Sequence, residues 1–225
     1  MREVTDNVAH DLRSPLNRLR TRLEMAMMGE GSTEEVRSEL ERSIADADHL
    51  LSTFNSLLAI ARAETGSMRD TMTSFDLGEL VRDAVELYEP VAEDAGIACT
   101  VETDEDLGII GNRELLAQAI ANLLDNAIKH GNKATCGAPH ILVAARRESG
   151  AVTVSVSDNG PGIAVEDRER VLGRFVRLEE SRNTPGSGLG LSLVSAAAQL
   201  HGGKLKLEDA EPGLKAVLRL PLRVA

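Results

Sequence analysis

The chain has 225 residues, 42% hydrophobic and 27% charged, which excludes an intrinsically disordered protein. Its formal net charge of −11 argues against non-specific binding to nucleic acid. With no Trp, one Tyr and three Phe, its core must be aliphatic. The two cysteines, Cys99 and Cys136, have no metal-ligand spacing and indicate reduced cytosolic thiols. No apolar run is long enough to span a membrane, and no signal peptide is visible.

The first expected helix runs to about Met28 and carries a candidate nucleophile. At about 100° per residue, His10 lies roughly 160° from the centre of the apolar stripe and so faces water, together with Ser14. The neighbouring carboxylate of Asp11 could fix the His10 tautomer and leave the other ring nitrogen free to attack. On this stretch alone, a merely solvated histidine is the alternative. The apolar stripe itself has intervals of three and four, at Val4, Val8, Leu12, Leu16, Leu19, Leu23 and Met27.

A second helix is predicted after the glycines near residue 30, because Ser32-Thr33-Glu34-Glu35 offers a capping box. Two helices joined by a short loop form an antiparallel hairpin. Since such a hairpin has too little core alone, we expect two copies to form a dimeric four-helix bundle. Packing against another domain of the same chain is the alternative. The apolar positions have a spacing close to a heptad: Val36, Leu40, Ile44, Ala47, Leu51, Phe54, Leu58 and Ala61.

Residues 65–74 have little hydrophobic pattern and predict a linker whose end reaches an edge strand. Helices mixed with strands that are adjacent in sequence indicate an α+β sandwich after it. The expected domains are therefore a helical hairpin at 1–64, the linker at 65–74 and the sandwich at 75–225. Within the sandwich, helices are expected at 77–93, 114–130 and 189–200, and strands at 97–102, 140–147, 152–157, 204–208 and 215–220.

Four pieces of the sandwich could converge on a nucleotide. The helix at 114–130 carries Asn122, Asn126 and Lys129 on one face, which suits Mg²⁺ and the phosphates that it bridges. Residues 158–162 (DNGPG) follow a strand, so that the carboxylate can accept from an exocyclic amino group while the glycines let a base approach. Residues 186–191 (GSGLGL) open a helix and offer main-chain N–H groups to phosphate. The polar, aperiodic stretch 177–185 is typical of a mobile lid.

Each piece also has an ordinary explanation: a polar helix face, a turn, or a weak glycine pattern. In this order, however, they resemble the motifs of a bacterial sensor histidine kinase of two-component signalling. The resemblance covers nearly the whole chain and implies a dimerising phospho-acceptor hairpin followed by an ATP-binding domain of the GHKL (Bergerat) type. The matching motifs are an H-box at 10–16 (HDLRSPL), an N-box at 122–130 (NLLDNAIKH), a first glycine box at 158–163 (DNGPGI), a phenylalanine box at 174–177 (RFVR) and a second glycine box at 186–191.

For the hairpin, the resemblance implies that His10 accepts the phosphoryl group of ATP, while Asp11 orients or deprotonates it. The group would then pass to an aspartate in the receiver domain of a response regulator. Relatives with strong phosphatase activity often carry Thr or Asn four residues after the histidine, and Ser14 keeps a hydroxyl there that could position a water. The family also implies a cytoplasmic homodimer. Because the chain starts so close to His10, we expect an upstream, membrane-anchored sensor, with no membrane contact in the chain itself.

For the sandwich, the resemblance implies that Asp158 binds the adenine amino group and that Asn126 ligates Mg²⁺. Asn122 and Lys129 would lie near the phosphates. A Bergerat-fold ATPase without kinase activity and a phosphotransfer scaffold are the alternative functions. The remaining implied residues are the glycines that shape the pocket and the lid hinge, Gly160, Gly162, Gly188 and Gly190, and two looser phosphate contacts, Arg177 and Arg182.

Overall fold

The structure is a computed structural model that describes residues 20–21, 23–24, 33–178 and 186–222. The chain divides into two compact units, residues 1–56 and 57–225. No helix in the described part of the chain is long and apolar enough to cross a membrane. Several expected features lie outside the described residues: His10, Asp11, Ser14, Arg182, most of the first helix, the capping residue Ser32 and residues 179–185.

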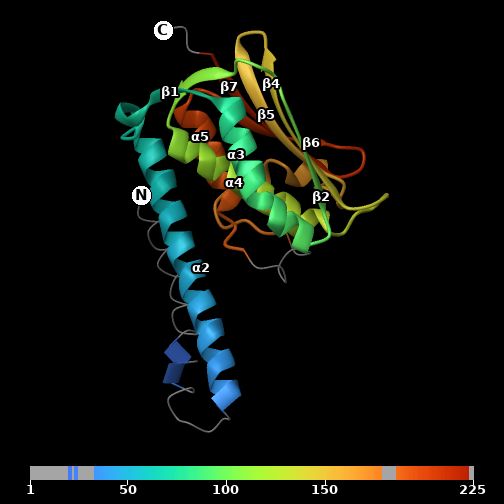
Figure 1. Cartoon of the computed structure of the whole chain (residues 1–225). Coiled ribbons are helices and arrows are strands. Elements are labelled where there is room, and N and C mark those ends of the chain that lie inside the picture. Colours follow the sequence, from blue (N-terminus) through green and yellow to red (C-terminus); the bar gives the residue numbers. More distant parts are fainter. Residues whose placement is uncertain (1–19, 22, 25–32, 179–185, 223–225) are drawn as a thin grey trace. The chain divides into compact units, whose positions relative to one another are not determined.

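The first unit contains most of the helix α2 (Thr33–Thr65), which confirms the predicted second helix (Figure 1). The backbone at residues 20–21 and 23–24 is also helical, as expected for the first helix. One face of α2 is buried at Ser43 and Thr53. Most apolar residues of the expected heptad seam are exposed, among them Leu40, Ile44, Leu51 and Phe54, whereas Val36 and Ala47 are half-buried. The described part of this chain therefore leaves most of the seam uncovered.

The last turns of α2 belong to the second unit. Ile60 and Ala63 are 1% and 4% exposed and join its core, and Glu64 forms an ion pair with Arg174. The expected linker contains the 3₁₀ turn η1 (Arg69–Thr71) and ends, as predicted, in a strand, β1 (Thr73–Asp76). This strand pairs antiparallel with β3 (Gly108–Gly111), a strand that the sequence did not reveal because it is short and bounded by glycines.

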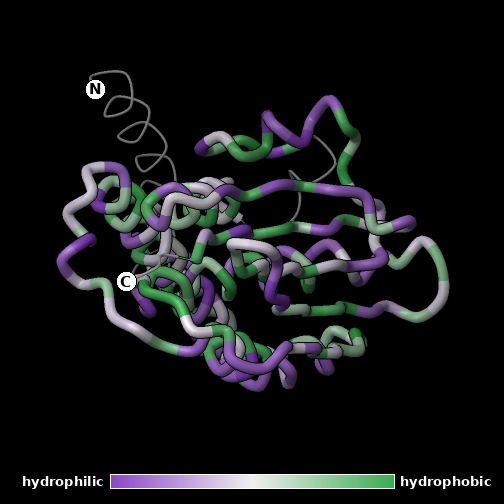
Figure 2. Tube along the Cα trace, turned by 90° about the horizontal axis from the view of Figure 1, so that it is seen from above, coloured by the Kyte–Doolittle hydropathy of each residue, from purple (hydrophilic) through white to green (hydrophobic). Residues whose placement is uncertain are grey.

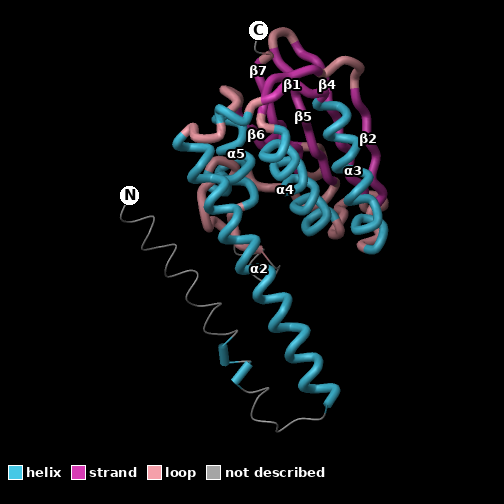
Figure 3. The backbone as a smooth tube through the Cα atoms, turned by 60° about the vertical axis from the view of Figure 1, so that its left-hand side comes forward, coloured by secondary structure: helices cyan, strands magenta, loops and turns pink. Residues whose placement is uncertain are grey.

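The main sheet has five strands in the order β2-β4-β5-β7-β6, and Figures 1 and 3 show the helices of the second unit on one of its faces. β2 runs parallel to β4, while the other neighbours are antiparallel. The predicted α+β sandwich is thus confirmed. The helices are α3 (Leu77–Asp94), α4 (Arg113–Gly131) and α5 (Gly190–Leu200); the strands are β2 (Ala98–Thr103), β4 (His140–Glu148), β5 (Ala151–Asp158), β6 (Lys204–Asp209) and β7 (Leu214–Pro221); two 3₁₀ turns are η2 (Val165–Asp167) and η3 (Arg170–Leu172).

The core between sheet and helices is aliphatic, as the composition requires. Strands alternate buried and exposed residues with a period of two, and Figure 2 shows the corresponding change of hydropathy along the trace. Leu116, Ile120 and Leu124 of α4 are 0% exposed and lie in this core. Cys99 and Cys136 are free thiols. Because the apolar residues of α4 are buried in this core, only the polar face of the helix is available for binding.

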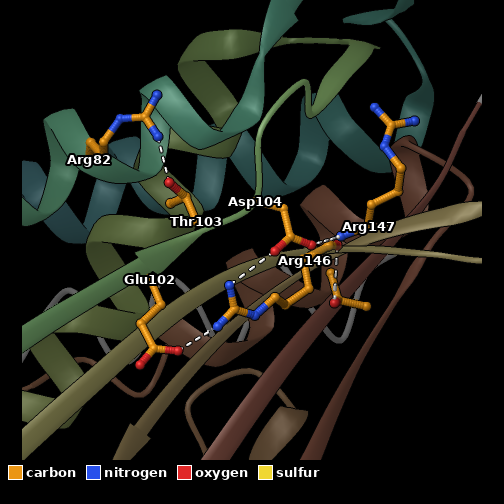
Figure 4. Close-up of polar contacts among 7 residues, drawn as sticks. Arg82, Glu102, Thr103, Asp104, Arg146 and Arg147 are labelled. Atoms are coloured by element: carbon orange, nitrogen blue, oxygen red, sulfur yellow. Dashed lines mark hydrogen bonds and ion pairs between the residues drawn. The ribbon is translucent and has the colours of Figure 1, made fainter.

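The edge strand β2 is tied to β4 by a polar cluster on the surface (Figure 4). Arg146 forms ion pairs with Glu102 and with Asp104, the latter at 3.0 Å, and the main-chain N–H of Arg147 donates to Asp104 at 2.9 Å. That main-chain hydrogen bond, together with the two arginines, lowers the pKa of the Asp104 carboxyl. Exposed ion pairs contribute little free energy, so the cluster mainly holds the register of the edge.

Candidate nucleotide-binding site

The helix α4 presents one polar face and anchors the site. Its first turn is capped by Asn112, whose Oδ1 accepts from the main-chain N–H of Leu115 at 2.7 Å. The Asn112 Nδ2 donates to the Thr71 hydroxyl at 2.7 Å, and the Asn112 N–H donates to Nε2 of His201 at 2.9 Å. The start of α4 is therefore fixed to the segment after α2 and to the end of α5.

The structure brings Asn122 and Asn126 of α4 together with Gly190, the first residue of α5. A methyl group built on Gly190 would lie 3.1 Å from Oδ1 of Asn122 and 3.4 Å from Nδ2 of Asn126. Nδ2 of Asn122 already donates to the carbonyl of Gln118 at 2.8 Å, which orients its Oδ1 toward Gly190. The second glycine box thus borders the two asparagines, as expected from their motifs, and only glycine fits there without displacing them.

Lys129 lies one turn further along α4 and is engaged within the helix. Its ammonium contacts Oδ2 of Asp125 at 2.5 Å, and both side chains are partly exposed. An exposed pair of this kind is worth about 0–1 kcal/mol. Lys129 could therefore leave Asp125 for a phosphate at little cost.

A second group of residues lies where α4 ends. Asp158, the last residue of β5, is 7% exposed, and its Oδ1 accepts from the N–H of Gly160 at 2.9 Å. A methyl group built on Gly160 would lie 2.7 Å from the carbonyl oxygen of His130, and one built on Gly131 would lie 3.2 Å from Cβ of Asp158. The first glycine box therefore packs closely against the last turn of α4.

Burial raises the pKa of the Asp158 carboxyl, and hydrogen bonds from the main-chain N–H groups of Gly160 and Leu214, with the charge of His130, offset this only in part. A buried carboxylate that still lacks compensation gains from a further hydrogen-bond donor. An exocyclic amino group of a base would supply that donor.

The phenylalanine box and the second glycine box are joined by two hydrogen bonds. The N–H of Phe175 donates to the carbonyl of Gly188 at 2.9 Å, and Nη1 of Arg177 donates to the carbonyl of Gly186 at 3.0 Å. Gly188 has φ = +69°, a conformation that favours glycine. Arg177, expected as a looser phosphate contact, thus binds the main chain at the start of the second glycine box. Gly162, with φ = +71°, lies against the main chain of Gly213 instead of the α4 residues.

The candidate site extends along α4, from Asn122 and Asn126 to the last turn of the helix, where Asp158 of β5 lies. At about 1.5 Å of rise per residue, Asn122 and Gly131 lie roughly 13 Å apart along α4, so the amides and Asp158 can hold opposite ends of one elongated ligand. Carboxamide oxygens are hard ligands that suit Mg²⁺, which prefers a few protein ligands plus substrate phosphates. No cluster of three or more His, Cys, Asp or Glu side chains suited to a metal occurs among the described residues. The carboxamide oxygens of Asn122 and Asn126 are therefore suited to bind Mg²⁺ together with a phosphate group.

Sequence reasoning missed two residues beside Asp158. The side chain of Asn159 binds the loop between α4 and β4, and Thr135 of that loop donates its N–H to the Asn159 carbonyl at 3.0 Å. Asn159 lies inside the first glycine box, so its amide was a visible signal. Its partners were not, because they are main-chain groups about twenty residues away in sequence.

Two family models match this chain. The model described as "Histidine kinase-, DNA gyrase B-, and HSP90-like ATPase" matches residues 111–224, and that of the His Kinase A (phospho-acceptor) domain matches residues 1–66. The first of these covers the whole of the site and implies that it binds ATP.

Relatives match over almost the full chain. The sensor-like histidine kinase SenX3 of Mycobacterium tuberculosis is 30% identical over 223 residues, 98% of this chain and 53% of SenX3. The probable sensor protein PcoS of Escherichia coli is 32% identical over 210 residues, 92% of this chain and 44% of PcoS. The chain thus spans about half the length of these relatives.

Solved structures of histidine kinases are also similar to this chain. The catalytic domain of the histidine kinase ThkA covers 67% of this chain and 97% of its own, at 30% identity and a TM-score of 0.58. ThkA in complex with the response regulator protein TrrA has a similar fold over 98% of this chain and 61% of that one, with 24% identity and a TM-score of 0.75. With a phospho-acceptor domain followed by an ATPase domain of the GHKL type, the chain belongs to the bacterial sensor histidine kinase family.

Proposed function

We propose that this chain transfers the γ-phosphoryl group of ATP to His10 and then to an aspartate of a response regulator. The observation that carries the proposal is the two-ended site on α4, with Asn122 and Asn126 at one end and Asp158 at the other, in a chain that also carries a phospho-acceptor domain. Phosphoryl transfer depends on positioning and charge neutralisation more than on covalent help from the protein.

In this proposal each residue of the site has one task. Asp158 accepts a hydrogen bond from the adenine amino group, while Gly160 leaves room for the base. Asn126 holds Mg²⁺, which when bound supplies positive charge at the phosphates, and Asn122 lies beside it. Lys129 leaves its pair with Asp125 to contact the phosphates, a rearrangement that its partial exposure makes inexpensive.

His10 supplies the nucleophile, and Asp11 orients its ring so that one nitrogen is free to attack. The nitrogen forms a bond to the γ-phosphorus as the bond to the bridging oxygen of ADP breaks. The phosphohistidine then passes its phosphoryl group to a carboxylate of the partner's receiver domain. We further propose that the Ser14 hydroxyl positions a water for phosphatase activity toward the regulator.

For the assembly, we propose a homodimer formed through residues 1–64, with residues 65–74 as linker and 75–225 as the ATP-binding domain. The exposed apolar residues of α2 support this assembly, because a second copy would cover them: Leu40, Ile44, Leu51 and Phe54. A cytoplasmic location, where ATP and response regulators are found, and an upstream membrane-anchored sensor complete the proposal.

The test is incubation of the full chain with Mg-ATP labelled at the γ-phosphate, followed by exposure of the labelled protein to acid. We expect an acid-labile label on His10 that His10→Gln abolishes while ATP affinity stays near wild type. Undiminished labelling of His10→Gln would contradict the assignment. ATP hydrolysis without any protein label would indicate an ATPase of the same fold, and neither hydrolysis nor label would indicate a phosphotransfer scaffold.

A further inference from the structure

The side chain of Asn159 directs all of its hydrogen-bonding groups at the loop between α4 and β4 and at the first residue of β4. Its Nδ2 donates to the carbonyl of Cys136 at 2.9 Å and to that of Ala138 at 2.8 Å, and its Oδ1 accepts from the N–H of His140 at 3.0 Å. An amide side chain has two N–H donors and one carbonyl acceptor, so each is engaged here. Asn159 therefore faces the loop and the start of β4, although Asp158 and Gly160 on either side of it line the site.

The loop held in this way, residues 132–139, connects the last turn of α4 to β4. Thr135 binds it to the same strand end, because its N–H donates to the Asn159 carbonyl at 3.0 Å and its hydroxyl lies 3.4 Å from the carbonyl oxygens of both Asn159 and Gly160. The ladder between β4 and β5 ends where Ile141 pairs with Asp158. Beyond that pair, the Asn159 side chain takes over the binding of the His140 N–H.

The position of this loop bears directly on the base end of the site. The loop continues from His130 and Gly131. A methyl group added to Gly160 would lie 2.7 Å from the His130 carbonyl oxygen, and one added to Gly131 would lie 3.2 Å from Cβ of Asp158, so both contacts are close. A shift of the loop would move the end of α4 relative to the Asp158 carboxylate. Close packing of this kind transmits small displacements.

We propose that Asn159 is a positioning residue for nucleotide binding, which holds the 132–139 loop and thereby fixes the end of α4 against Asp158 and Gly160. The inference rests on the proposed function, because it takes the base of ATP to bind at Asp158. Its effect should fall on nucleotide affinity, since the residue touches neither the phosphates nor His10 in this proposal.

An ordinary explanation exists for an asparagine at a strand end. Asn and Asp are both favoured in turns, because their side-chain oxygens accept hydrogen bonds from nearby main-chain N–H groups. If that were the whole role of Asn159, aspartate would replace it well. The two N–H donors of Asn159 distinguish a residue that holds the loop from an ordinary turn residue. An ionised aspartate has no donor and would face the carbonyl oxygens of Cys136 and Ala138.

The experiment compares Asn159→Asp with the matched control Asn132→Asp in the full chain. Asn132 lies in the same loop and is exposed, and its side chain makes no hydrogen bond to the described residues. Both variants add one negative charge to this loop region, but only the first removes the donors. We expect Asn159→Asp to weaken Mg-ATP binding about fivefold or more in calorimetric titration, the equivalent of one net hydrogen bond, with the control within about twofold.

Two further measurements separate positioning from a general loss of structure. The KM for ATP should rise by the same factor as the dissociation constant while kcat is retained, and the main-chain N–H groups of residues 135–138 and of His140 should exchange hydrogen faster. If Asn159→Asp does not fold, Asn159→Ser with Asn132→Ser as its control gives the same comparison without added charge.

Equal ATP affinity in wild type and Asn159→Asp would overturn the inference, as would equal losses in Asn159→Asp and Asn132→Asp. In both of these outcomes the wild type still binds ATP. Failure of the proposed function would appear differently, as a wild-type chain that leaves His10 unlabelled, whether or not it binds Mg-ATP.

Discussion

The helices α2 and α4 carry apolar stripes of similar spacing, yet only one stripe is covered. On α4, Leu116 and Leu124 are 0% exposed beneath the sheet. On α2, the seam residues Ile44 and Leu51 are 62% and 61% exposed. Periodicity shows that a helix face is apolar but carries no information on what covers it. The apolar stripe of α4 is thus buried within its own domain, whereas burial of the α2 seam would require a surface outside the described residues.

The polar faces differ in the opposite sense. The polar face of α4 gathers Asn122, Asn126 and Lys129 and borders Gly190, so it forms a site. Exposed i,i+4 and i,i+3 ion pairs occupy the surface of α2 near Arg37 and Arg42, where they stabilise the helix slightly. In the proposed function, therefore, the covered helix α4 would bind the nucleotide through its polar face, and the uncovered helix α2 would bind a second copy through its apolar face.

The largest expected effect concerns the uncovered stripe. Leu51→Asp should dissociate the proposed dimer, because each buried leucine is worth about 1.5–3 kcal/mol and the substitution occurs in both copies, which weakens association by roughly 100-fold or more. Sedimentation velocity of the full chain would measure this change. Ser52→Asp, which adds the same charge at the next, exposed position, should leave the dimer intact. A wild-type chain that is monomeric at micromolar concentration would contradict the proposed dimer.

The covered stripe is tested by Leu124→Ala. Removal of this fully buried side chain should lower the free energy of unfolding of the ATP-binding domain by about 3 kcal/mol, within the usual 2–5 kcal/mol range. Urea unfolding can be followed through Tyr88, the only tyrosine of a chain without tryptophan. Leu87→Ala, at a position 73% exposed on α3, should change stability by less than about 0.5 kcal/mol. Equal losses in the two variants would be inconsistent with this assignment of the core.

A smaller effect concerns the base preference at the end of α4. In the proposed site, adenine would offer an amino group to the Asp158 carboxylate, whereas guanine would present an oxygen at that position and leave a buried charge unpaired, at a cost of about 1–3 kcal/mol. ATP should therefore bind roughly tenfold more tightly than GTP. In Asp158→Asn, ATP binding should weaken and the preference should narrow, because the amide can rotate to offer a donor. Dissociation constants for both nucleotides decide the matter, and an unchanged ratio in the folded variant would remove Asp158 from base recognition.

The smallest expected effect is a pH dependence of stability in the nucleotide-free chain. Because burial raises the pKa of Asp158, the folded state holds this proton more tightly than the unfolded state. Its contribution to stability therefore falls as the pH rises from the ordinary aspartate value of about 4 through the raised folded pKa. Asp158→Asn should gain stability relative to wild type across that window, although it binds ATP more weakly.

Thermal unfolding of wild type and Asp158→Asn between about pH 4 and pH 7 measures this difference. Asp70→Asn, at an exposed position, controls for the loss of one charge and should show no such trend. If the advantage of Asp158→Asn shrinks with rising pH, or if Asp70→Asn shares it, the buried carboxylate is not the cause.

Most regular elements could be predicted because they depend on neighbouring residues. The periodicity of α3 and α4 and the alternation of β4 and β5 are local patterns, and their observed bounds lie within about two residues of those expected. The strand β3 was missed because its four residues carry no repeating pattern of their own. The parallel pairing of β2 with β4 was equally invisible, since β2 meets β4 across an intervening helix and not a hairpin.

The chemical identity of the site residues was legible in the chain: two amides at helical spacing, a carboxylate at a strand end, and glycines where backbones approach. These are properties of short segments and survive without knowledge of the fold. Their meeting was decided only by tertiary packing, which sets Gly190 beside Asn122, closes Gly160 against the His130 carbonyl and directs Asn159 to a loop of distant residues. Packing also decided which apolar stripe is covered, because burial depends on surfaces that lie far away in sequence.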